Sequence, residues 1–309
     1  MFALNFYEKK EEKIAKPLKT RKGICENYSA LFTDICSKTG IKSFEIEGYT
    51  KQNGFADYIP HAWNAALIDS TWFAFDPTWG SGYVSGGKFF PKINNEYYKA
   101  APSSLITSHM PFDYLWQFLY YPISNQEFYE GKTMQNRSKP FFNYIDSIGL
   151  YEKQSHTEQL RSSASRIERN GIKNSMIFDR LQHIKLEIEQ DKQSKSVNLY
   201  NSAVTDFNGA INDYNTFIQY RNKQFIPKKP DPEIRKMIDS AEIKIKASKS
   251  KLGEIVNPDE NAIAMIQQLN KSLDEAAVRV KELQDWLKKY FSKSTSDRKM
   301  MFYDKIETK

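Results

Sequence analysis

The sequence predicts an α+β protein in which a helix packs on an antiparallel sheet and an all-α helical bundle follows. Apolar residues recur at helical spacing from about residue 25, and short strand-like runs lie between residues 44 and 76. Long polar segments with apolar stripes fill the chain after about residue 150. A chain of 309 residues also exceeds the usual single-domain length. We therefore expect two domains, residues 1–148 and residues 149–309.

The first helix is expected to begin at Cys25. Residues 1–20 are rich in Lys and Glu and indicate a short arm or a helical remnant. Gly23 is expected to allow a tight entry turn, and Gly40 supplies a C-terminal stop. The apolar positions that recur three or four residues apart are Tyr28, Leu31, Phe32 and Ile35. Cys25 therefore falls in the first turn of a helix of about 13 residues.

Three runs that follow have strand character, at residues 44–49, 61–68 and 72–76. The last two are separated by Asp69 and Ser70, which indicate a tight hairpin turn. Glycine-rich loops are expected after Pro77, and irregular or short helical structure is expected over the aromatic, proline-interrupted residues 94–121.

The second half predicts a bundle of about four helices with antiparallel neighbours, because the connecting loops are short. Asp231 followed by Pro232, and Asn257 followed by Pro258, resemble helix starts. Four apolar stripes support the bundle: Ile177, Leu181, Ile184 and Ile188; Tyr200, Val204, Phe207, Ile211, Tyr214 and Ile218; Ile234, Ile238, Ala241 and Ile245; and Ile266, Leu269, Leu273, Ala276, Val280, Leu283, Leu287 and Tyr290.

The charge distribution argues against a nucleic-acid-binding protein. Of the net charge of +7, residues 1–150 contribute +1 (16 basic and 15 acidic side chains) and residues 151–309 contribute +6 (29 and 23). Basic residues interleaved with acids are typical of a solvated helical surface. No stretch approaches the ~18 apolar residues of a membrane span, and residues 1–13 do not resemble a signal peptide. The compartment is left unassigned.

Cys25 is the candidate nucleophile. The pKa of a thiol falls at a helix N-terminus and beside an imidazolium. His61 opens a strand, and a two-residue turn at Asp69 and Ser70 makes Asp76 its diagonal neighbour on the same face, where a carboxylate would orient the imidazole. If Cys36 lies on the same helix as Cys25, their Cα atoms are ~16 Å apart, beyond the ~7 Å limit for a disulfide.

Three segments carry a resemblance to a known family: residues 23–28, residues 61–64 and residues 76–80. They resemble the transglutaminase-like superfamily, whose papain-type core packs a cysteine helix on an antiparallel sheet. The resemblance is strong over about residues 20–82. It extends more loosely from His109 to Phe128, where it includes bacterial transglutaminase-domain proteins and relatives of kyphoscoliosis peptidase. It implies the nucleophile at Cys25, the general base at His61 and the orienting acid at Asp76.

The resemblance implies acyl transfer through a Cys25 thioester on a protein or peptide substrate. We expect hydrolysis, as in a peptidase or amidase, rather than cross-linking, because water needs no second binding site. No cofactor and no calcium dependence are expected, since no Asp-rich calcium loop is present. The alternative is a catalytically silent domain that serves as an envelope-associated binding or scaffold protein, with another protein bound by the helical bundle.

Only 24 residues precede Cys25, fewer than the family usually has. The expectation is a truncated or unusually short N-terminus, and truncation would imply a periplasmic or secreted protein. It also removes the region where animal members place a tryptophan donor for the oxyanion. The Cys25 backbone amide is then the one expected donor that the sequence names.

Several residues carry two interpretations. Trp63 and Trp79 are candidate walls of the substrate cleft, although packing is the commoner role for such residues. Cys36 is expected to lie in the core. His109, His156 and His183 lack partners at ligand spacing, so no metal site is predicted.

Overall fold

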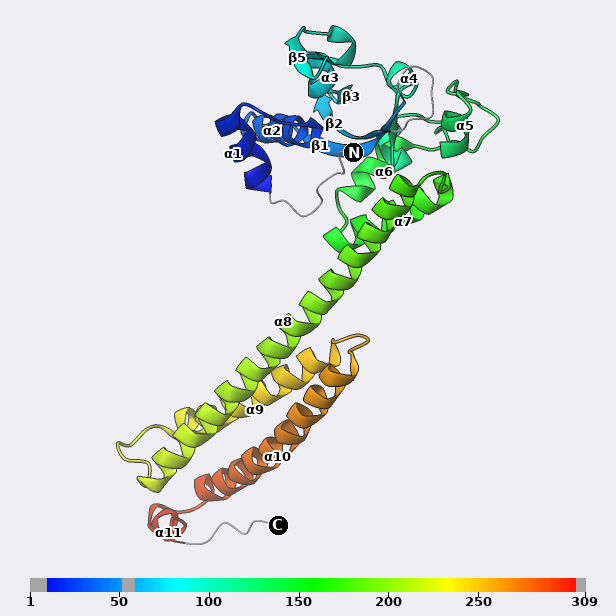
Figure 1. Cartoon of the computed structure of the whole chain (residues 1–309). Coiled ribbons are helices and arrows are strands. Elements are labelled where there is room, and N and C mark those ends of the chain that lie inside the picture. Colours follow the sequence, from blue (N-terminus) through cyan, green and yellow to red (C-terminus); the bar gives the residue numbers. More distant parts are fainter. Residues whose placement is uncertain (1–9, 52–58, 304–309) are drawn as a thin grey trace. The chain divides into compact units, whose positions relative to one another are not determined.

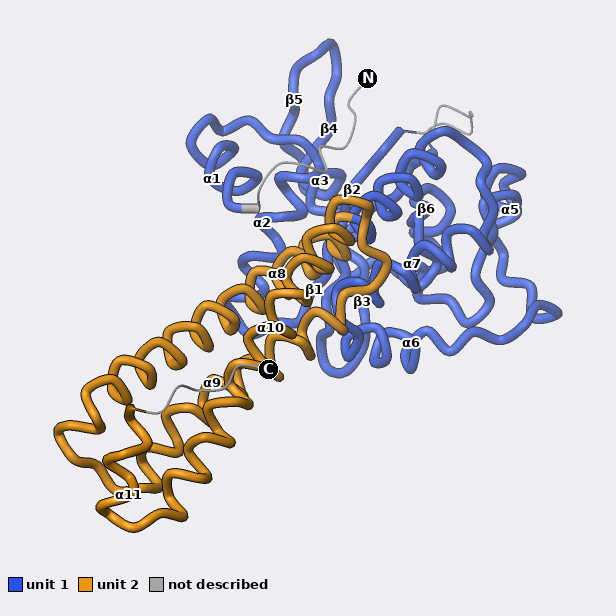
Figure 2. Tube along the Cα trace, turned by 90° about the horizontal axis from the view of Figure 1, so that it is seen from below, with its two compact units in different colours: residues 1–189 blue, residues 190–309 orange. Residues whose placement is uncertain are grey.

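The computed structural model describes residues 10–51 and 59–303. The chain divides into two compact units, Met1–Glu189 and Gln190–Lys309 (Figure 2). The boundary between the two units, after Glu189, lies well beyond residue 148, where the sequence analysis places the domain boundary. That boundary stays a prediction.

Two helices begin the described part of the first unit. Helix α1 spans Lys10–Thr20 and α2 spans Cys25–Lys38, which confirms the predicted cysteine helix. Gly23 does not adopt a left-handed conformation, and its role in a tight entry turn stays a prediction. A methyl group at Gly23 would lie 3.3 Å from Cβ of Pro17 and 3.2 Å from Cβ of Asn27. Gly23 therefore lets α1 pack closely against the start of α2.

The sheet has four antiparallel strands in the order β3-β2-β1-β6; Figure 1 labels β1, β2 and β3, and Figure 2 labels β6. The strands span Ser43–Thr50 (β1), Ile59–Ile68 (β2), Thr71–Phe75 (β3) and His109–Pro111 (β6). Ile68 pairs with Thr71, which confirms the predicted hairpin register. Asp69 and Ser70 form the turn with positive φ angles of 49° and 63°, as a tight hairpin requires. Strand β6 lies in the segment predicted to be irregular.

The region after Pro77 was predicted to be glycine-rich loops, and that prediction is partly wrong. A short helix α3, Pro77–Ser81, leads into a second hairpin of β4, Gly82–Ser85, and β5, Lys88–Pro91. Gly86 and Gly87 form its turn with positive φ angles. Short helices then follow: η1 (Asn95–Tyr97), α4 (Pro102–Leu105), η2 (Tyr114–Gln117), α5 (Asn125–Tyr129) and α6 (Tyr144–Tyr151).

Each face of the four-stranded sheet is covered. Helix α2 packs on one face, where Oγ of Ser29 donates to the Trp63 carbonyl at 2.9 Å and Nδ2 of Asn64 donates to the Ser29 carbonyl at 3.0 Å. The other face carries an aromatic-rich core with the segments that follow β5, formed by Ile46, Trp63, Ala65, Trp72, Ala74, Ala100, Leu105, Leu115, Phe118 and Ile148. The sheet is therefore held rigidly from both sides, as an α+β core requires.

Two long helices complete the first unit and begin the second. Helix α7 spans His156–Asn170, and α8 spans the 48 residues Ser175–Asn222. The stripe at Ile177, Leu181, Ile184 and Ile188 packs with Tyr49, Met110 and Phe128 of the first unit. Its assignment to the bundle was therefore wrong. The stripe that begins at Tyr200 lies further along the same helix, in the second unit.

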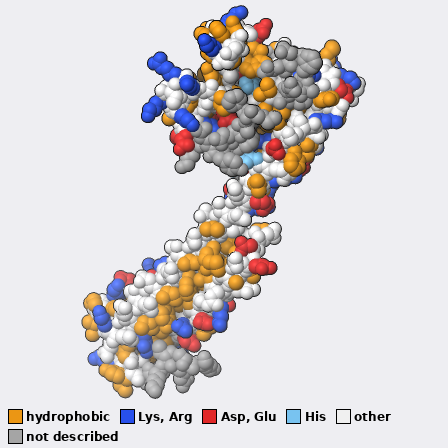
Figure 3. All heavy atoms as spheres, viewed as in Figure 1, with side chains coloured by type: hydrophobic (Ala, Val, Ile, Leu, Met, Phe, Trp, Pro, Cys, Tyr) orange, Lys and Arg blue, Asp and Glu red, His pale blue; other side chains and the backbone are white. Residues whose placement is uncertain are grey.

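The second unit is all helical. It consists of the later part of α8 with α9 (Asp231–Gly253), α10 (Glu260–Phe291) and the short α11 (Thr295–Met300). The predicted stripes form its core, and hydrophobic side chains form a visible band along this unit (Figure 3). The N-cap of α10 is Asp259, whose side chain accepts from the Ala262 amide, rather than Asn257. Among the described helices none is long and apolar enough to cross a bilayer.

Candidate active site

Asp76 lies at the junction between β3 and α3. Its Oδ1 accepts hydrogen bonds from the backbone amides of Thr78 and Trp79, at 2.9 and 3.0 Å. This is an N-cap, and Pro77 at the first helical position favours the same start because its ring presets the helical φ angle. The backbone amide of Asp76 donates to the Tyr97 carbonyl at 3.0 Å. The carboxylate is therefore fixed through both its side chain and its backbone.

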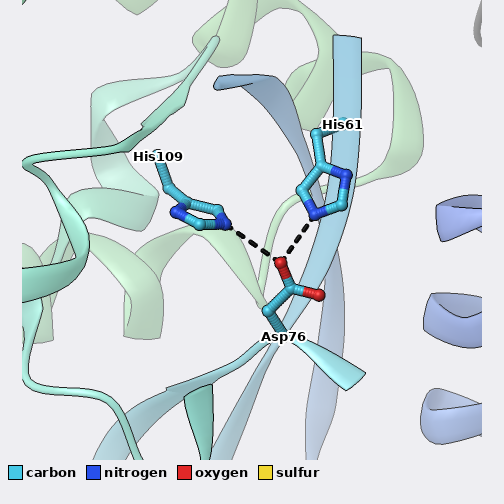
Figure 4. Close-up of side chains that lie close together, drawn as sticks. All are labelled: His61, Asp76 and His109. Atoms are coloured by element: carbon cyan, nitrogen blue, oxygen red, sulfur yellow. Dashed lines mark hydrogen bonds and ion pairs between the residues drawn. The ribbon is translucent and has the colours of Figure 1, made fainter. Parts of the chain in front are cut away.

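The second carboxylate oxygen of Asp76 meets two histidines (Figure 4). Its Oδ2 lies 2.6 Å from Nε2 of His61 on β2 and 3.0 Å from Nε2 of His109 on β6. All three residues are buried, with 1% of Asp76, 5% of His61 and 1% of His109 exposed. The pair of His61 and Asp76 was predicted from the hairpin, and the contact with His109 was not.

Cys25 is the first residue of α2 and is half-buried. Its backbone N–H is among the first four of the helix, which have no acceptor within the helix. After burial and Asp76, Cys25 is among the groups that set the pKa of His61, and it raises this pKa. Because Asp76 engages Nε2 of His61, Nδ1 is the ring nitrogen that remains for the thiol. Cys25 and Cys36 are both free thiols, and Cys36 is buried as predicted.

The turn before Cys25 is held by α1. Oδ1 of Asn27 accepts from the Ile24 amide at 2.8 Å, and Nδ2 of Asn27 donates to the Lys13 carbonyl at 2.9 Å. The buried Glu26 lies 3.4 Å from Nζ of Lys13. These contacts fix the position of the Cys25 backbone.

The electrostatics of the site favour an ion pair between His61 and Asp76. Burial lowers the pKa of His61, but hydrogen bonds and negative charge from Asp76 and Cys25 outweigh it and raise this pKa to about 9. Burial also raises the pKa of Asp76, but hydrogen bonds from His109 and His61 hold it well below its usual range. At neutral pH His61 is therefore an imidazolium and Asp76 a carboxylate.

His109 behaves differently from His61. Its burial lowers its pKa and outweighs the hydrogen bond and charge of Asp76, so this histidine is neutral at pH 7. Its Nδ1 lies 2.8 Å from Oγ of Ser108.

Two tryptophans were predicted as walls of the substrate cleft, and their burial differs. Trp79 is partly exposed, and its ring centroid lies 5.5 Å from that of His61 and 4.6 Å from that of His109. Trp63 is 1% exposed and contacts both histidines from within the core. Burial favours packing as the role of Trp63. Contact of either residue with substrate stays a prediction.

His61, Asp76 and His109 also form a group of potential metal ligands. One atom from each lies within 4.8 Å of the others. Two ligands bound to Zn²⁺ at 2.0–2.1 Å with tetrahedral angles lie about 3.3 Å apart. The 2.6 Å between His61 and Asp76 is shorter than this and matches a charge-assisted hydrogen bond. We therefore interpret the group as a hydrogen-bonded cluster, and the expectation of no metal site stays a prediction.

His109 is the residue that sequence reasoning missed. It has no partner at a recognisable sequence spacing, because Asp76 lies 33 residues before it. The available signal was a histidine beside an apolar pair, Met110 and Pro111, at the start of the loosely matching segment. His156 is exposed, and His183 lies 3.3 Å from Glu187 on α8.

Comparison with known proteins adds to this geometry. A family model described as "Transglutaminase-like superfamily" matches residues 2–77, a range that includes Cys25, His61 and Asp76. Kyphoscoliosis peptidase of Mus musculus is 33% identical over 147 residues, which is 44% of this chain and 22% of that protein.

Two more distant relatives match smaller parts. Hillarin of Drosophila melanogaster is 26% identical over 122 residues, 33% of this chain and 15% of that protein. The Lim and transglutaminase domain protein ltd-1 of Caenorhabditis elegans is 26% identical over 121 residues, 33% of this chain and 17% of that protein. The chain thus spans about one fifth or less of the length of these relatives.

Proposed function

The chain belongs to the transglutaminase-like superfamily through its N-terminal unit, and on this basis we propose that it is a thiol enzyme that transfers acyl groups through a thioester on Cys25. The observation that carries the proposal is the position of His61. It is hydrogen-bonded to Asp76 at 2.6 Å, and Cys25 is among the groups that raise its pKa. This is the arrangement in which an imidazolium stabilises a neighbouring thiolate.

The reaction begins when the Cys25 thiolate attacks the carbonyl carbon of an amide. The tetrahedral intermediate collapses as the C–N bond breaks, and the leaving nitrogen takes the proton from Nδ1 of His61. Water then attacks the thioester and gives a proton to His61. The C–S bond breaks, and the thiolate and the imidazolium are restored.

Asp76 acts through His61 rather than on the substrate. Its contact with Nε2 fixes the orientation of the ring and leaves Nδ1 for the thiol. Its negative charge stabilises the imidazolium that exists before acylation and after deacylation. The developing oxyanion is expected to meet the backbone N–H of Cys25 at the start of α2.

The proposed substrate is a protein or peptide, and the proposed acceptor is water. The name peptidase, which two relatives carry, supports hydrolysis. Transfer to an amine would require a second binding site beside the thioester. An amine is therefore the second choice of acceptor, and parallel assays of peptide cleavage and amine incorporation separate the two.

Thiol reactivity tests the proposal. We expect the unsubstituted protein to react with iodoacetamide at pH 6 at Cys25, while the buried Cys36 serves as an internal control. Cys25→Ala removes that reaction and all peptide cleavage and amine incorporation. If Cys25 at pH 6 reacts no faster than a free cysteine, and Cys25→Ala changes neither activity, the enzyme proposal is wrong.

A catalytically silent binding protein is the alternative. The observation that favours it is a groove of about 240 Å³ in the second unit, where helices α8, α9 and α10 meet. Its lining includes the apolar residues Phe207, Ile211 and Tyr214 and the basic residue Arg279. An inert Cys25 together with retained partner binding by Cys25→Ala would support this alternative.

A further inference from the structure

We propose that His109 is a positioning residue of this site, which donates a hydrogen bond from Nε2 to Oδ2 of Asp76 and so holds the carboxylate as an oriented anion against His61. The inference deepens the proposed function, because it assigns a fourth residue to the same site. It rests on that function only for its effect on the reaction. The hydrogen bond itself can be tested separately.

The carboxylate of Asp76 has four donors. Oδ1 accepts from the amides of Thr78 and Trp79, and Oδ2 accepts from His61 and His109. The side chains of Asp76 and His109 are 0% exposed, so no solvent can replace a missing donor from outside. Without the donor of His109, Oδ2 keeps only His61, and the buried carboxylate loses the stabilisation of one hydrogen bond to a charged group.

The direction of the hydrogen bond follows from the charges of the three side chains. Ionised Asp76 has no proton to give, so Nε2 of His109 must carry the hydrogen. Neutral His109 has a single ring hydrogen, which leaves Nδ1 as an acceptor. Oγ of Ser108 is the group in reach of Nδ1, at 2.8 Å, and therefore donates to it. The other acceptor for this hydroxyl, the Leu105 carbonyl, lies further away at 3.4 Å.

The position of His109 is fixed independently of Asp76. The residue pairs with Thr50 of β1 in the sheet. Three aromatic rings surround the imidazole, with centroid distances of 4.6 Å for Trp79, 5.2 Å for Trp63 and 5.9 Å for Tyr97. His109 is therefore a rigid donor that can orient the carboxylate.

The titratable groups around Asp76 come from every neighbouring element. His61 lies on β2, His109 on β6 and Tyr97 on η1, and Cys25 of α2 acts through His61. Burial and then the charges of Asp76 and Glu96 raise the pKa of Tyr97, so its hydroxyl stays neutral below pH 10. The groups that set the acid side of a pH profile are consequently Asp76 and His61.

Two substitutions separate donation from packing. His109→Gln retains an N–H donor in place of Nε2, whereas His109→Phe retains the ring but has no donor. We expect His109→Phe to lower the rate of Cys25 alkylation at pH 6 by about tenfold or more, and to move the acid limb of the pH profile up by about one pH unit. His109→Gln should stay within about threefold of the unsubstituted protein. The exposed His156 provides the matched control, His156→Phe, which should change neither quantity.

The proposal is wrong if His109→Phe has the same rate of Cys25 alkylation and the same pH profile as the unsubstituted protein. Equal impairment of both His109 variants with an unchanged profile would do so as well, because it would indicate packing alone. If neither variant folds, ¹⁵N NMR of the unsubstituted protein decides. Neutral His109 protonated at Nε2 between pH 6 and 8 supports the proposal, and protonation at Nδ1 alone overturns it. This measurement needs no activity, so it remains decisive even if Cys25 proves to be an ordinary thiol.

Discussion

Gly48 lies against the indole ring of Trp63. A methyl group added to Gly48 would lie 2.6 Å from Cη2 of Trp63 and 2.2 Å from the carbonyl oxygen of Met110. Gly48 pairs with His61 of β2 on one side and with Pro111 of β6 on the other. Because Gly48 has no side chain, β2 and β6, which carry His61 and His109, can pair with β1 at normal spacing. The ring of Trp63 then covers Gly48.

Gly48→Ala should consequently disturb both the sheet and the site. The backbone contact with Met110 cannot be relieved by a rotamer change, so we expect a destabilisation of about 1–3 kcal/mol. Thermal unfolding measures the stability, and iodoacetamide labelling of Cys25 should slow as His61 and His109 separate. Gly149→Ala is the matched control, because nothing lies within 4 Å of its added methyl group. A Gly48→Ala protein as stable and reactive as this control would contradict the prediction.

Asp76→Asn should remove the charge of the site while it keeps the helix cap. Asn is as good an N-cap as Asp, so α3 should persist. Burial lowers the pKa of His61, and the hydrogen bond and charge of Asp76 raise it. Without the carboxylate, the pKa of His61 should therefore fall from about 9. We expect alkylation of Cys25 at pH 6 to slow by about a hundredfold. NMR titration of His61 gives the pKa, and Asp146→Asn on α6 is the control that should leave both values unchanged. An unshifted pKa of His61 would contradict this explanation.

His61 should make the stability of the protein depend on pH. Its pKa is raised from 6.5 to about 9, so its contribution is fully present below pH 6.5 and is lost as the pH rises through 9. The loss should be on the order of 3 kcal/mol. Denaturant unfolding at pH 6 and pH 10 measures it by comparison with His61→Gln, which lacks the titrating group. Equal losses in the two proteins would show that other groups cause the pH dependence.

Fragments should reveal where the first domain ends. Arg166 of α7 makes a buried bidentate ion pair with Asp113, with Nε and Nη2 at 2.6 and 2.7 Å from the carboxylate oxygens. A fragment of residues 1–148 would leave this buried carboxylate unpaired, at a cost of about 3–5 kcal/mol, and would expose the core beneath α7. We expect residues 1–189 to unfold cooperatively and residues 1–148 not to fold. Cooperative unfolding of both fragments would favour the sequence-based boundary.

Local patterns explain which parts of the fold could be predicted. The helix at Cys25 and the hairpin from β2 to β3 follow from short-range signals, namely apolar spacing and the turn at Asp69 and Ser70. That hairpin register also places Asp76 beside His61. The pairing of these two side chains could therefore be deduced from the amino-acid sequence alone.

Non-local contacts explain what could not be predicted. Strand β6 has three residues, too few for an alternating pattern, so neither the strand nor the partner of His109 could be found. The two apolar stripes on α8 were predicted as separate stripes of the bundle, and residues 189–199 between them are mostly polar. That segment has no glycine or proline to end a helix, and α8 runs through it without a break.

The pairing of β6 with β1 also bears on how the protein reaches its native state. Helix α2 can form from neighbouring residues alone, whereas His109 joins Asp76 only after Thr50 and His109 close a long loop. Contacts between such distant positions form late, because the entropy lost in closing the loop must be overcome first. During refolding, helical signal should therefore recover before the thiol gains its full reactivity, so chemical labelling of Cys25 reports completion of the fold.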